Sequence, residues 1–83
     1  MLTKKESYDL YILHKKINEG KADKKEKLRY VELLYKDNRI TPKEYDNYRQ
    51  QIEKENSDID WNILLGIGGL ALALFLLLKA FKR

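Results

Sequence analysis

Cysteine is absent from these 83 residues, and histidine and proline occur once each. Without cysteine there is no disulfide framework, no thiolate nucleophile and no cysteine-ligated metal. A single histidine, His14, excludes a two-histidine zinc site within one chain, and we expect it at the edge of a helix face. Three of the four glycines lie inside an apolar run, so no glycine-rich phosphate loop is present. The sequence therefore predicts no enzyme, no cofactor and no metal site.

Most of the net positive charge comes from the C-terminal end. Residues 1–60 hold 14 of the 17 Lys and Arg and all 13 Asp and Glu, a net charge of +1. The other three positive charges, Lys79, Lys82 and Arg83, raise the total to +4. A net positive charge that comes mainly from three C-terminal residues is a weak argument for nucleic-acid binding, which we do not expect.

The longest apolar run covers Trp61–Leu78 and contains no charged residue. As a helix at about 1.5 Å per residue it would be roughly 27 Å long, close to the thickness of a bilayer core. It is apolar on all sides, unlike the single stripe of a water-soluble helix. The run predicts one transmembrane helix at 61–79 and a basic tail at 80–83, with the interfacial anchors Trp61, Lys79, Lys82 and Arg83.

Small residues recur inside this apolar run. Gly69 and Ala73 are four residues apart, and Gly66 lies about one turn before them. Small residues at this spacing allow close approach of two helices in lipid. The sequence therefore predicts that these three residues pack against another membrane helix.

Three helix starts precede the run, each with a capping residue three positions before a glutamate. The pairs are Thr3 with Glu6, Asp23 with Glu26, and Thr41 with Glu44, which is the spacing of a capping box. Gly20 and Asn38 suit the left-handed conformation that ends many helices. We expect helices at about 4–19, 24–37 and 42–56, followed by a short hinge at 57–60.

The first sixty residues contain six tyrosines, which is a large number for so small a domain. A tyrosine ring can bury apolar surface while its hydroxyl group remains in contact with water. This property suits both the edge of a thin core and a binding surface. Three short helices are too small to bury all six. The residues predicted to contact a partner are Tyr30, Leu34, Tyr35, Tyr45 and Tyr48.

Residues 28–54 contain, in order, the leucine pair Leu33-Leu34, a turn followed by Ile40-Thr41, the acid and aromatic Glu44-Tyr45, and Ile52, which closes the second helix. In this pattern they resemble the SHOCT (short C-terminal) domain family. Asn38 replaces the usual turn glycine, and the family's domain normally ends a chain. The resemblance implies a small helical hairpin for oligomerisation or docking, without catalysis.

Together these patterns predict an all-α protein, with a small three-helix domain at 1–56 (two short antiparallel hairpins) and one C-terminal transmembrane helix. The expected function is a single-pass, tail-anchored adaptor or scaffold. Its partners would be the bilayer and either another protein or copies of itself. The charges beside the apolar run favour a cytoplasmic C-terminus, but export of a charged domain without a signal peptide argues against that, so we expect the domain in the cytoplasm. A holin-like membrane-active protein and an accessory subunit of a larger membrane complex remain alternatives.

Overall fold

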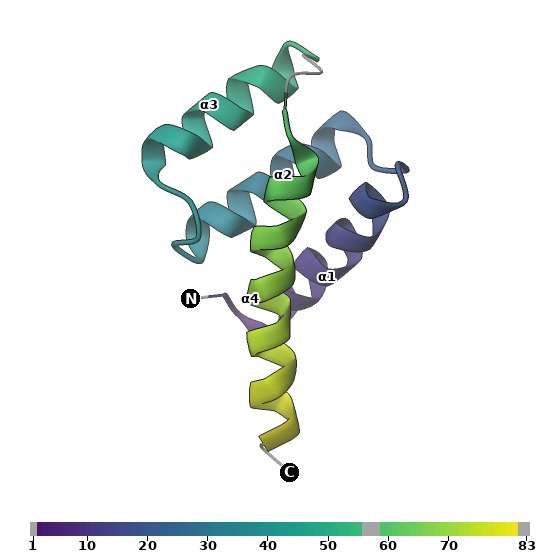
Figure 1. Cartoon of the computed structure of the whole chain (residues 1–83), viewed down its shortest axis with the longest axis vertical. Coiled ribbons are helices and arrows are strands. Elements are labelled where there is room, and N and C mark those ends of the chain that lie inside the picture. Colours follow the sequence, from purple (N-terminus) through teal and green to yellow (C-terminus); the bar gives the residue numbers. More distant parts are fainter. Residues whose placement is uncertain (1, 56–58, 82–83) are drawn as a thin grey trace.

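The computed structural model describes residues 2–55 and 59–81, with the backbone alone at 75 and 78–81. This part of the chain forms four helices and no strand: α1 (Lys4–Asn18), α2 (Lys24–Lys36), α3 (Pro42–Glu53) and α4 (Trp61–Phe81) (Figure 1). The first three helices begin at the residues expected from the sequence. They end one, one and three residues before the expected positions.

Capping boxes fix the starts of α1, α2 and α3. The side chains of Thr3, Asp23 and Thr41 each accept a hydrogen bond from the backbone N–H three residues later. The glutamate at that later position accepts one in return from the backbone N–H of the capping residue. Each box satisfies two N–H groups that have no partner within the helix. The three capping boxes predicted from the sequence are confirmed.

Each of these three helices is followed, two residues after its end, by a residue with positive φ. Gly20 has φ 71°, Asn38 has φ 57° and Glu55 has φ 53°. After α1 the N–H of Lys21 donates to the carbonyl of Lys16, and after α2 the N–H of Arg39 donates to that of Leu34. These bonds close a Schellman turn, which satisfies carbonyls at the helix end. The left-handed conformations expected at Gly20 and Asn38 are confirmed, whereas that of Glu55 was not predicted.

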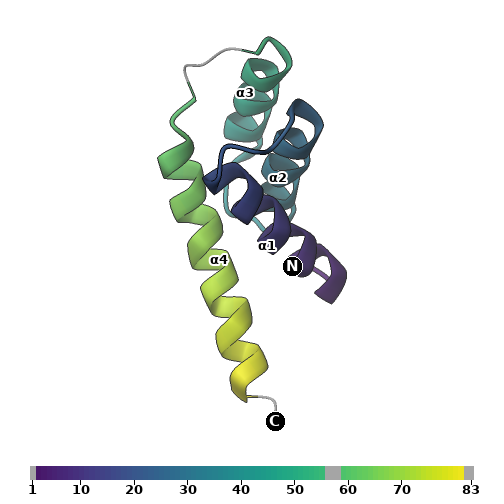
Figure 2. The same ribbon diagram turned by 90° about the vertical axis from the view of Figure 1, so that its right-hand side faces the viewer.

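Helix α2 lies at the centre of the fold. It contacts both α1 and α3, while α4 packs against α1 at an angle (Figure 2). The most buried side chains come from α1, α2 and the start of α4. Their exposed fractions are 0–1%, and the residues are Leu10, Tyr30, Val31, Leu33, Leu34 and Leu64.

Helix α4 corrects the main sequence prediction. Among the residues that the structure describes, no helix is long and apolar enough to cross a membrane. The transmembrane helix predicted at 61–79 is therefore wrong, as are the single-pass, tail-anchored description and the membrane location with a cytoplasmic domain. The N-terminal part of α4 instead uses its apolar residues for packing within the chain, burying Leu64, Gly68, Ala71 and Leu72.

Candidate functional site

A buried polar junction joins α1, α2 and α4 around the hydroxyl group of Tyr30. The Tyr30 side chain is fully buried. Its hydroxyl donates a hydrogen bond to the backbone carbonyl of Leu64 in α4, at 3.2 Å between oxygens. The same oxygen lies 2.9 Å from Nδ1 of His14 in α1. One hydroxyl group from α2 therefore links α1 and α4.

The hydrogen-bond donors at this junction can be assigned from the two hydrogen bonds of the Tyr30 hydroxyl group. Since the Tyr30 hydroxyl donates to a carbonyl, the consistent assignment has the N–H at Nδ1 of His14 donating to the Tyr30 oxygen. Burial lowers the pKa of His14 from its usual 6.5. Burial also raises the pKa of the Tyr30 hydroxyl. Both shifts favour the uncharged forms, so the junction is a neutral link between helices.

Gly68 is the residue that lets α4 approach this junction. A Cβ atom at position 68 would overlap the Tyr30 hydroxyl oxygen and lie 2.7 Å from Cζ of the same ring. It would also lie 3.4 Å from Nδ1 of His14. The space beside the Gly68 backbone is thus filled by the end of the tyrosine side chain.

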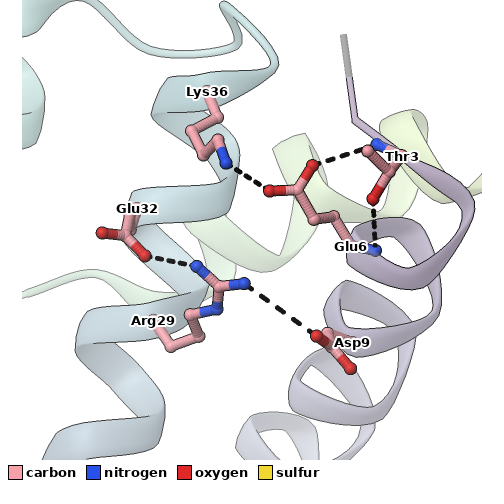
Figure 3. Close-up of polar contacts among 6 residues, drawn as sticks. All are labelled: Thr3, Glu6, Asp9, Arg29, Glu32 and Lys36. Carbon is pink, nitrogen blue, oxygen red and sulfur yellow. Dashed lines mark hydrogen bonds and ion pairs between the residues drawn. The ribbon is translucent and has the colours of Figure 1, made fainter.

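Ion pairs hold α1 against α2 on the other side of the hairpin (Figure 3). Glu6 near the start of α1 pairs with Lys36 at the end of α2. Asp9 lies 3.9 Å from Arg29, which also pairs with Glu32 within α2. A further pair joins Lys16 to Glu26 at the opposite end. Their order along the two helices shows that α1 and α2 are antiparallel.

Glu6 has two structural roles at once. One carboxylate oxygen accepts the backbone N–H of Thr3 at 3.0 Å in the α1 capping box, and the other contacts Lys36 (Figure 3). The hydrogen bond from Lys36, followed by that from Thr3, lowers the pKa of Glu6 to about 2. Glu6 therefore stays ionised far below neutral pH and fixes the start of α1 to the end of α2.

Neither cluster has the composition of an active site. In the described residues no three His, Cys, Asp or Glu side chains come together as metal ligands. No buried side-chain polar atom in that part of the chain lacks a hydrogen-bond partner. His14 is occupied by Tyr30, so the arrangement supplies structural links and brings no acid, base and nucleophile together.

The residues predicted to contact a partner do not share one exposed surface. Tyr30 and Leu34 are fully buried, which leaves them no surface to offer. Tyr35 stacks on Tyr45 across α2 and α3, with ring centroids 4.5 Å apart, and Tyr48 is half-buried. The most exposed tyrosines are instead Tyr8 and Tyr11 on α1, which sequence reasoning did not select.

The predicted residues of the apolar run are also separated. Gly66 and Ala73 are exposed, whereas Gly69 faces inward, where a Cβ would lie 3.8 Å from His14. Trp61 is half-buried, and Nζ of Lys27 lies 5.8 Å from the centroid of its ring. This cation–π contact joins α2 to α4. The Lys79 side chain, Lys82 and Arg83 lie outside the described residues.

Sequence reasoning selected two small residues, Gly66 and Ala73, of an exposed apolar surface on α4 but missed its large residues. This surface lies on the side of the helix away from α1. Its large members are Ile63, Leu70 and Leu77, with exposed fractions of 55%, 68% and 55%. Exposed Gly66 and Ala73 lie between them. We call these five residues the outer stripe. Their spacing can be read from the sequence, but it does not stand out because the residues between them are apolar as well.

Comparisons with protein-family models, with curated proteins and with solved structures found no match for this chain. The resemblance of residues 28–54 to SHOCT domains therefore stays a prediction.

Proposed function

We propose that this chain is a non-catalytic interaction module that binds an apolar helix along the outer stripe of α4. The observation that carries the proposal is the exposure of Ile63, Leu70 and Leu77 along one side of α4, whose opposite side is buried as far as Leu72. A contiguous apolar surface of this kind marks a site of interaction. A helix is the matching partner, since helices present apolar residues at the same spacing of three and four.

The rest of the fold is suited to presenting this surface. Leu64, Ala71 and Leu72 fix the inner side of α4 against its neighbours. Every described side chain after Leu72 is exposed, and the end of α4 projects beyond the other helices (Figures 1 and 2). A free apolar helix end is marginal in water without packing. A partner helix along α4 would supply that packing.

The SHOCT-like hairpin formed by α2 and α3 favours the same class of function, because the resemblance implies docking or oligomerisation. Within that hairpin, the predicted contact residues that keep some exposure are Tyr35, Tyr45 and Tyr48. We keep them as a secondary contact beside the outer stripe.

The test compares two glutamate substitutions on α4. Leu70→Glu changes the most exposed large residue of the outer stripe, whereas Leu76→Glu changes an exposed leucine (56%) that lies outside the stripe. Each tagged variant is expressed in its native cells, crosslinked at short range and purified, and the crosslinked peptides are identified by mass spectrometry. We expect crosslinks from α4 to one helical segment, lost in Leu70→Glu and kept in Leu76→Glu. Equal crosslinking of both variants would contradict the proposal.

A further inference from the structure

The outer stripe has a regular order of spacing and of size. Ile63, Gly66, Leu70, Ala73 and Leu77 are separated by three, four, three and four residues, the a/d spacing of a coiled coil. Large and small residues alternate along it, and the sequence continues the alternation at Ala80. This order suits a partner whose large residues meet the small residues of α4.

We propose that the partner helix is α4 of a second copy of this chain, packed antiparallel along the outer stripe. This inference rests on the proposed function and names its partner. Its support is the self-complementarity of the stripe, together with the distribution of charge around α4.

Symmetry decides the direction of the pair. In a parallel pair the two-fold axis runs along the helices, so each residue faces its own copy. Leu70 would then face Leu70, and Gly66 would face Gly66, so wide layers would alternate with gaps. In an antiparallel pair the order of one helix is reversed, and large residues face small ones. Facing positions of opposite size interdigitate at native packing density.

One register pairs every member of the stripe. With the two-fold axis between positions 71 and 72, Leu70 of one copy faces Ala73 of the other. Leu77 then faces Gly66, and Ile63 faces position 80, an alanine by sequence. Each large residue meets a residue with little or no side chain, which allows the two helix backbones to approach closely.

Charge supports the same direction. By sequence, Asp58 and Asp60 precede α4, whereas Lys79, Lys82 and Arg83 lie at its end or after it. An antiparallel pair places the acidic end of each helix beside the basic end of the other. It also opposes the two helix macrodipoles, which a parallel pair would align side by side. A parallel pair would in addition place like charges together at both ends.

The first measurement is the mass of the purified full chain by sedimentation equilibrium. We expect twice the chain mass of 9.9 kDa. Leu70→Glu should reduce it to the mass of one chain, and Leu76→Glu should leave it doubled. Both leucines are exposed in the single chain, so circular dichroism should show that all three proteins are folded and helical.

The second measurement tests direction and register by disulfide formation, for which a chain without cysteine is well suited. Gly66→Cys and Leu77→Cys are made in separate chains that carry different tags and are expressed together. In the proposed register residue 66 of one copy faces residue 77 of the other, so a disulfide between the two chain types should form. Residue 66 lies eleven positions from its own copy, about 16 Å along the axis, beyond the reach of a disulfide. Each variant alone should therefore stay uncrosslinked.

The outcomes separate this inference from the proposed function. A dimer in which Gly66→Cys crosslinks to itself is parallel, and it overturns the antiparallel pair. A dimer whose mixed cysteine chains fail to crosslink overturns the register. A monomer that binds a different helical protein through Leu70 overturns the self-pairing but leaves the proposed function standing. A monomer that binds no protein, or that binds only lipid vesicles through this surface, overturns both.

Discussion

The hydroxyl oxygen of Tyr30 on α2 occupies the space that a side chain at Gly68 of α4 would need. A large side chain and the smallest residue are thus complementary across two helices that are distant in sequence. The same hydroxyl donates to the carbonyl of Leu64, one turn earlier in α4. The position of α4 therefore depends on this tyrosine and this glycine together.

Gly68→Ala should destabilise the fold even though alanine is the better helix former. The added methyl group would overlap Tyr30, and overpacking of this kind costs typically about 1–3 kcal/mol. The gain of about 1 kcal/mol in helix propensity offsets only part of it. Gly66→Ala is the matched control, because nothing lies within 4 Å of its Cβ position in the single chain. Both variants are made in the Leu70→Glu background, where no second copy packs on residue 66, and there Gly66→Ala should be stabilising. The measurement is urea unfolding at one protein concentration; equal stability of the two variants would contradict the close approach of Tyr30.

Tyr30→Phe should weaken the junction while preserving the ring that fills the core. It removes the donor to the Leu64 carbonyl and the acceptor for His14. Leaving buried polar groups without partners costs about 1–3 kcal/mol. Tyr8→Phe changes a tyrosine that is 61% exposed, and it should change stability by less than about 0.5 kcal/mol. Similar unfolding midpoints for the two variants would show that the Tyr30 hydrogen bonds contribute little.

His14 should make the fold less stable below neutral pH. Its pKa in the folded chain is lowered by burial from 6.5, so the unfolded chain binds the proton more readily. The stability that depends on a neutral His14 is fully present above pH 6.5 and is lost as the pH falls through the lowered folded-state pKa. Because His14 is the only histidine, urea unfolding at pH 7 and pH 5.5 isolates its effect. His14→Gln should reduce this pH dependence, and an unchanged dependence would contradict the assignment.

Local features of the fold could be predicted from the sequence, because neighbouring residues determine them. Thr41 and Glu44 satisfy each other's backbone three residues apart, and Asn38 adopts positive φ within its own turn. These interactions require no knowledge of what the helix packs against. The first three helix starts were therefore predicted correctly.

Packing between distant segments could not be predicted in the same way. The sequence indicates that a tyrosine such as Tyr30 suits a core edge or a binding surface, but it does not show that Tyr30 meets His14 and α4. For the same reason Tyr30 was assigned to a binding surface although it is fully buried. A continuous apolar sequence shows only that its residues avoid water, and it does not show whether lipid or protein covers them. The run from Trp61 therefore suggests a membrane span, although part of it is buried within the fold. What covers Leu64 or Gly68 depends on α1 and α2, thirty and more residues away in sequence.

The ends of the helices provide a last pair of opposed substitutions. Glu55 after α3 has φ 53° and Gly20 after α1 has φ 71°, a conformation that costs a residue with a Cβ atom roughly 1–2 kcal/mol. Glu55→Gly removes that strain and should raise the free energy of unfolding by about 1 kcal/mol. Gly20→Ala introduces the strain and should lower it by a similar amount, since open space around Gly20 excludes a steric clash as the cause. Thermal unfolding followed by circular dichroism measures both; a decrease in stability for Glu55→Gly would show that its side chain contributes more than the backbone conformation costs.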